Sequence, residues 1–211
     1  PDIQGVWATR FVTRLEKGRG PDFDHLVLLA RLQEETGQVD RARNSYETAL
    51  ARNAEAVDVR LKLIRLLELS GDLDKVIGHY QKLIRVAPQN ADFAFQLADA
   101  YLQRGQPADA LRVLTQLEER SKQQEDALAR LVDVYERMGE NDRAMALLER
   151  LAKGNDPRHL VELGDRYFAR GETERALKIW QRLARDPNDA AALHALGDVY
   201  LDHDLPDRAL E

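Results

Sequence analysis

The sequence contains no cysteine, which excludes disulfide bonds, thiolate nucleophiles, iron–sulfur clusters and cysteine zinc sites. Aromatic residues make up only 6% of the 211 residues, and the 12 glycines and 7 prolines are too few for a disordered or collagen-like chain. No apolar run approaches the roughly 20 residues that a membrane-spanning helix needs, so we expect no direct membrane insertion. The abundant Ala, Leu, Arg and Glu favour helices over sheets.

The net charge is negative. Asp and Glu number 37 against 31 Lys and Arg, which gives −6 at neutral pH. A negative chain is repelled by a phosphate backbone, so we expect no nucleic-acid partner. Basic residues are mostly arginine, 24 against 7 lysines, and together with the high alanine content this indicates a GC-rich bacterial gene. The compartment stays open between cytoplasm and bacterial periplasm.

Similar residues recur along the sequence about every 34 positions. Glycines, and finally an aspartate, mark this period at Gly37, Gly71, Gly105, Gly139, Gly171 and Asp204. A leucine stands eight residues before each of these positions, and a small or short apolar residue stands five residues after it. Each period therefore holds two apolar stripes at helical spacing, separated by a turn, which predicts a helix–turn–helix unit.

This pattern resembles the tetratricopeptide repeat (TPR) family, whose motif reads W-x2-L-G-x2-Y, then A-x3-F, then P, over 34 residues. The best copies are Leu160-x2-Leu163-Gly164-x2-Tyr167 with Ala176-x3-Trp180, and Leu193-x2-Leu196-Gly197-x2-Tyr200, while Pro88 and Pro187 match the closing proline. We interpret Ala30, Ile64, Ala98 and Val132, which replace the motif glycine, as volume adjustments at helix contacts. The resemblance implies an all-α, right-handed superhelical solenoid of helix–turn–helix repeats.

The register predicts about five full repeats with half a repeat at each end. The full repeats are 23–56, 57–90, 91–124, 125–156 and 157–189. Residues 1–22 are predicted to hold the second helix of a truncated repeat, and 190–211 to be a truncated repeat at the other end. Solenoid ends need polar caps that we do not find here, so we expect a fragment of a longer array, or else end-to-end self-association through the open ends.

Repeat 125–156 is two residues short. Gly154 or Asn155 is expected to stop its last helix in the left-handed conformation, and Pro157 to begin the next helix. We interpret the deletion either as a neutral loop variant or as a local change of superhelical pitch.

The sequence shows no catalytic constellation. The histidines form no pair at metal-ligand spacing such as i, i+4, and neither a Gly-rich phosphate loop nor a Gly-x-Ser-x-Gly motif occurs. Trp180 and the tyrosines lie on the core stripe, where packing explains them better than cofactor stacking. We therefore predict a non-catalytic protein with no metal site and no cofactor.

The resemblance also implies a concave groove lined by the first helices, faced by the second, fifth, ninth, twelfth and thirteenth residues of each repeat. These positions hold 13 acids and four arginines, so acidic charge is concentrated there. The candidate partner-binding residues among them are Val27, Arg31, Leu61, Arg65, Phe95, Asp99, Leu102, Asp133, Glu136, Val161, Asp165, Phe168, His194, Asp198 and Leu201.

The leading hypothesis is a protein–protein interaction scaffold. Its acidic and apolar groove would bind an extended or helical partner segment carrying Lys or Arg and apolar side chains, with acids steering and apolar contacts supplying affinity. The groove lacks the Lys and Asn with which some TPR domains clamp a C-terminal carboxylate. Its aspartates could instead be ordinary surface residues.

Two other functions remain as alternatives. The chain could be a scaffold of a bacterial envelope polysaccharide-export or secretion machine, recruiting a periplasmic enzyme or guiding a cationic polymer. It could also be an accessory segment of an enzyme whose catalytic domain lies elsewhere.

Overall fold

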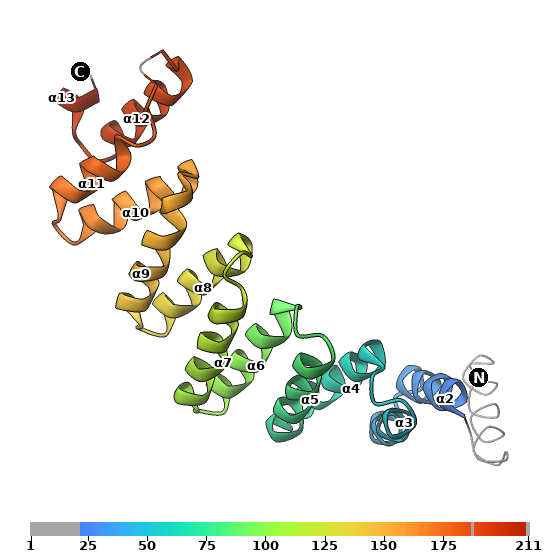
Figure 1. Ribbon diagram of the computed structural model, residues 1–211. Helices are drawn as coiled ribbons and strands as arrows, with labels where there is room; N and C mark the ends of the chain where they lie inside the picture. Colours follow the sequence, from blue (N-terminus) through green and yellow to red (C-terminus); the bar gives the residue numbers. More distant parts are fainter. Residues whose placement is uncertain (1–21, 187, 210–211) are drawn as a thin grey trace. The chain divides into compact units, whose positions relative to one another are not determined.

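The computed structural model describes residues 22–186 and 188–209 (Figure 1). These residues form twelve α-helices and one 3-10 turn, and no strand occurs among them. None of the described helices is both long and apolar enough to cross a membrane. Apart from Asp22, the segment predicted to hold the second helix of a truncated repeat lies outside the described residues.

The chain divides into two compact units, one up to Leu117 and one from Glu118 onward. The first contains α2 (Phe23–Glu35), α3 (Val39–Arg52), α4 (Val57–Leu69), α5 (Leu73–Val86), α6 (Ala91–Gln103) and most of α7 (Pro107–Arg120). The second contains α8 (Glu125–Arg137), α9 (Asn141–Leu151), η1 (Ala152–Gly154), α10 (Pro157–Ala169), α11 (Thr173–Trp180), α12 (Ala190–Asp202) and α13 (Pro206–Ala209). Within each unit, helices that follow one another pack together as hairpins. The predicted all-α solenoid class of helix–turn–helix repeats is confirmed.

Each hairpin turns at one residue in the left-handed conformation. Its φ lies between 72° and 79° at Gly37, Gly71, Gly105, Gly139 and Gly171, and is 57° at Asp204. The next residue donates its backbone N–H to the carbonyl five residues back, as Gln38 does to Gln33 at 2.7 Å, which ends the first helix. Glycine takes this φ without steric cost, and aspartate is one of the few side chains that tolerate it.

A close helix contact joins α10 to α11. Trp180 is completely buried, and its indole Nε1 donates to the Val161 carbonyl at 3.3 Å. A Cβ atom added to Gly164 would lie 2.0 Å from that Nε1 atom, so the Trp180 ring occupies the space of the missing side chain. The motif glycine is therefore required here, whereas a Cβ at the equivalent Gly197 would meet no atom within 4 Å.

The shortened repeat ends as predicted. Asn155 has φ 60° and ψ 25°, in the left-handed region, and Pro157 begins α10. The Asn155 Oδ1 atom accepts hydrogen bonds from Arg182 Nη2 at 2.6 Å and Arg185 Nη2 at 2.7 Å. These arginines follow α11, so the residues after one hairpin fix the loop that precedes it.

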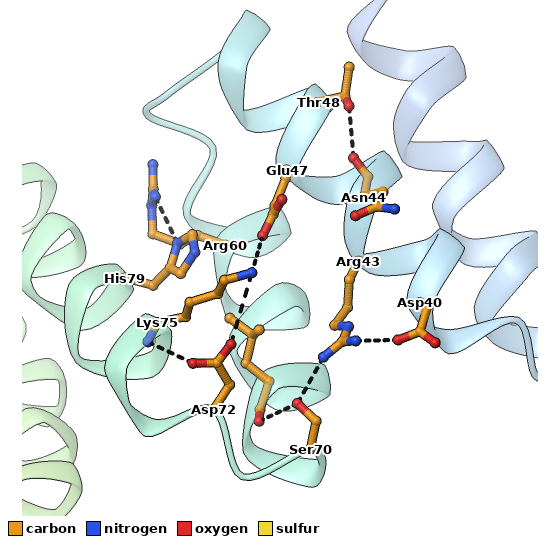
Figure 2. Close-up of polar contacts among 11 residues, drawn as sticks. Asp40, Arg43, Asn44, Glu47, Thr48, Arg60, Ser70, Asp72, Lys75 and His79 are labelled. Carbon is orange, nitrogen blue, oxygen red and sulfur yellow. Dashed lines mark hydrogen bonds and ion pairs between the residues drawn. The ribbon is translucent and has the colours of Figure 1, made fainter.

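Polar side chains join α3, α4 and α5 (Figure 2). The Arg60 guanidinium is buried, with the residue only 3% exposed, and it donates to the Ala54 carbonyl and contacts His79 Nδ1 at 3.2 Å. On the surface, Lys75 lies between Glu47 and Asp72, 3.3 Å and 3.9 Å from their carboxylates. Burial, with the Arg60 charge, lowers the pKa of His79 from its usual 6.5 to about 4.

Gly164→Ala is expected to lower the free energy of unfolding by about 1–3 kcal/mol, because the new Cβ overlaps the Trp180 ring. Gly197→Ala is the matched control at the same repeat position, and it should be neutral or stabilise by about 0.5–1 kcal/mol through helix propensity. Urea denaturation followed by circular dichroism measures both. Equal midpoints for the two variants would contradict the packing described here.

His79 is expected to make stability depend on pH. Its folded pKa of about 4 lies below the unfolded value of 6.5, so its contribution is present above pH 6.5 and lost as the pH falls toward 4. His79→Gln keeps an acceptor for Arg60 but cannot titrate. Urea unfolding should show the two proteins diverging by about 1–2 kcal/mol across this window. Parallel pH curves would show that His79 does not titrate differently in the two states.

Candidate functional site

In the first unit, predicted groove residues gather around buried tyrosines. The Tyr46 hydroxyl donates to Glu34 Oε2 at 3.1 Å. Burial, followed by the Glu34 carboxylate, raises the pKa of Tyr46, while Arg31 and Arg65 act in the opposite direction. The fold thus brings Arg31 of α2 and Arg65 of α4 to one tyrosine.

The next repeat has the same arrangement around Tyr80, but an aspartate stands where the first has an arginine. The Tyr80 hydroxyl donates to Glu68 Oε1 at 3.3 Å, and Asp99 of α6 adds to the rise in the pKa of Tyr80 that burial and Glu68 cause. Asp99 therefore takes the place that Arg65 has near Tyr46. The surface changes from charge-balanced to acidic over one repeat of this unit.

The apolar groove candidates of the first unit differ in exposure. Leu61 is 38% exposed on α4, and Val27 and Leu102 are half-buried. Phe95 is only 3% exposed. It follows two other buried residues of α6, Phe93 and Ala94, and its ring belongs to the interior and offers no surface to a ligand.

In the second unit, two candidates are used in contacts within the chain. Glu136 of α8 pairs with Arg166 of α10: the Arg166 Nη2 atom donates a hydrogen bond to Glu136 Oε2 at 2.8 Å, and Arg166 Nε forms an ion pair with Glu136 Oε1 at 2.7 Å. Asp165 Oδ1 lies 3.0 Å from His203 Nε2, beyond the end of α12. These contacts tie the first helices of neighbouring repeats together.

The His203 ring also completes an aromatic cluster. Its centroid lies 4.6 Å from that of Trp180 in a stacked geometry and 4.7 Å from that of Phe168. Phe168, a predicted groove residue, is therefore partly covered by the next repeat.

The other candidates of this unit face solvent. Asp133 is exposed on α8, and Leu201 is 56% exposed on α12. On α12 the Asp198 side chain is 70% exposed and lies 4.0 Å from His194, whose side chain is 88% exposed. Val161 is half-buried. Among the candidate aspartates of this unit, Asp133 and Asp198 are thus exposed, whereas Asp165 contacts His203 of the next repeat.

A cluster that the sequence search missed lies where α8 and α10 begin. His159 Nε2 lies 2.9 Å from Glu125 Oε1, and ligand atoms of Glu125, Asp156 and His159 all lie within 4.8 Å of one another. The Arg158 guanidinium and backbone N–H hydrogen-bond to Asp156 and lower its pKa to about 2. The three-residue spacing of Asp156 and His159 is the sequence signal for this cluster, and pairs of histidines alone do not reveal it.

Family models described as tetratricopeptide repeat match residues 27–91, 69–124, 102–160 and 157–199. Similar solved structures include the crystal structure of MamA protein, with 20% identity, a TM-score of 0.49, and coverage of 87% of this chain and 96% of that one. Another is the crystal structure of YrrB, described as a TPR protein with an unusual peptide-binding site, with 18% identity, a TM-score of 0.45, and coverage of 89% and 96%. No curated protein matches the sequence significantly.

The helical hairpins and their left-handed turns define a helical-repeat protein. The matched ranges overlap and together cover residues 27 to 199. The chain belongs to the tetratricopeptide repeat family, whose members serve as protein-interaction scaffolds.

Glu136→Gln is expected to lower the free energy of unfolding by about 0.5–1 kcal/mol, because Arg166 loses its ionic partner on α8 at a partly exposed site. Asp133→Asn on the same helix should change it by less than about 0.5 kcal/mol. Urea unfolding at low and high salt compares them, and salt should shrink the Glu136 effect. A larger loss for Asp133→Asn would show that Asp133 has a structural role.

Proposed function

We propose that this chain is a non-catalytic scaffold whose first helices bind an extended or helical partner segment rich in basic and apolar side chains. The repeats are taken to run over 23–56, 57–90, 91–124, 125–156 and 157–189, with a truncated repeat at 190–211, so that α2, α4, α6, α8, α10 and α12 supply the binding face. Both units carry such helices, and the proposal applies to each separately.

The exposure of two leucines carries the proposal. Leu69 is 76% and Leu201 56% exposed, the highest values for large hydrophobic side chains in the described part of the chain. Both stand at groove-facing positions predicted from the repeat register. Exposed leucines on first helices mark surfaces that gain free energy when a partner covers them.

Acidic side chains accompany these leucines. Glu68 precedes Leu69 on α4, and Asp198 lies three residues before Leu201 on the same face of α12. A partner with Lys or Arg next to Leu, Ile or Phe would complement both features. The acids would act mainly on association rate and specificity, and the apolar contacts mainly on affinity.

The test uses short fluorescent peptides of alternating Lys and Leu, with Glu/Leu and Ser/Leu peptides of equal length. Fluorescence anisotropy should show the Lys/Leu peptide binding most tightly, and less tightly as salt rises. Asp133→Lys with Asp198→Lys should weaken its binding about tenfold, which corresponds to about 1.4 kcal/mol. Leu201→Ser should weaken it as well.

The matched control reverses charge on second helices, with Glu119→Lys on α7 and Asp142→Lys on α9, both exposed. It should reduce Lys/Leu binding less than threefold, because only long-range attraction changes. Tighter binding of the Glu/Leu peptide, or equal effects of both double variants, would refute the proposed face. A chitosan oligomer serves as a cationic polysaccharide for comparison. If it bound more tightly than any peptide, and Leu201→Ser did not change its affinity, the polymer-guiding alternative would be favoured.

A further inference from the structure

We propose that Glu125, Asp156 and His159 bind a divalent transition-metal ion of the Zn²⁺ class. The site lies in the second unit, where the first turns of α8 and α10 meet across the shortened repeat. It is separate from the leucines and aspartates of the proposed binding face and does not depend on that function.

The three side chains offer one imidazole nitrogen and two carboxylates, a donor set that suits zinc and related ions. Their ligand atoms lie within 4.8 Å of one another, and the His159–Glu125 pair at 2.9 Å. Zinc bonds of about 2.0–2.2 Å place tetrahedral ligands about 3.4 Å apart. Rotation of the exposed Glu125 side chain would bring its carboxylate toward that geometry.

Two of the ligands are held in place by the fold. The His159 side chain is only 7% exposed, so burial fixes its ring and leaves Nε2 directed at Glu125. Asp156 is the N-cap of α10, where its Oδ1 accepts the Arg158 backbone N–H at 2.8 Å. Glu125 is 55% exposed at the start of α8 and can move to close the site. Preorganisation of this kind lowers the entropic cost of binding.

A cavity of about 510 Å³ adjoins the cluster, lined by Glu125 and Asp156 together with Leu128, Leu151 and Asn155. Three protein ligands leave at least one coordination position for an outside group, as in zinc sites that keep a water. The cavity gives that position room for water or for a side chain of a partner.

Nearby cations oppose an added metal ion. Lys122 and Arg150 line the cavity, and the Arg158 Nη2 atom lies 2.8 Å from Asp156 Oδ2. Arg150 lies 3.2 Å from Glu118, while the Arg158 side chain is 77% exposed and can swing into solvent. Removing Arg158 should therefore tighten metal binding, an effect opposite to that of removing a ligand.

Metal binding should also compete with protons. A metal ion binds an imidazole nitrogen only when that nitrogen carries no proton, so a proton on His159 Nε2 would have to leave before the metal could bind there. Apparent affinity is expected to fall as the pH is lowered.

The experiment measures Zn²⁺ affinity of the untagged full chain by competition with a chromogenic chelator. Glu125→Gln should weaken binding at least tenfold, and Arg158→Ala should tighten it. Glu119→Gln is the matched control at an exposed glutamate on α7, and its affinity should equal that of the parent. Ca²⁺, which prefers all-oxygen sites, should bind far more weakly than Zn²⁺.

Thermal unfolding gives a second measurement, because an ion bound only by the folded chain raises the melting temperature. Zn²⁺ should raise it for the parent and the Glu119→Gln variant, and much less for Glu125→Gln, whose exposed side chain is dispensable for folding. His159→Gln should behave as Glu125→Gln does. Equal Zn²⁺ affinity of the parent and Glu125→Gln, or no change with Arg158→Ala, would overturn the assignment.

Discussion

The chain reverses direction at each left-handed residue, and the packing of the two helices of every described hairpin follows from this reversal. It ends a first helix in the same hydrogen-bonded way in every described hairpin, and so sets where the second helix starts. Only then do the two apolar stripes face each other and bury residues such as Tyr46, Leu63 and Trp180. The Gly164–Trp180 contact shows how closely the helices approach once this reversal is made: the ring fills the space that any side chain would need.

The first-helix surface combines structural and exposed charges. Arg31, Glu34 and Arg65 compensate one another around Tyr46, while Glu68 and Asp99 concentrate negative charge around Tyr80. In the second unit, Arg166 and His203 engage two of the acids. Equivalent positions of successive repeats therefore share the same helix geometry but carry different charges. This allows one scaffold to present different surfaces to partners.

The shortened repeat leads into a cluster of polar side chains at the start of α10. Asp156 is the N-cap of that helix, and His159 Nε2 lies 2.9 Å from Glu125 Oε1 at the start of α8. Asn155 and the two arginines that hold it fix this loop. The register predicted the left-handed stop and the start at Pro157, but not the cluster, since Glu125 and His159 are 34 residues apart and meet only when neighbouring repeats stack.

The helical hairpins, their turns and the core stripe can be predicted from the sequence, because they follow from local periodicity and from the few residues that accept a positive φ. The sequence also indicates which positions lie on first helices. Three facts are seen only in the folded chain: Phe95 is buried, Asp165 contacts His203, and Glu136 pairs with Arg166. The physical reason is that the exposure and pairing of a side chain depend on the repeat stacked against it, which no single repeat encodes.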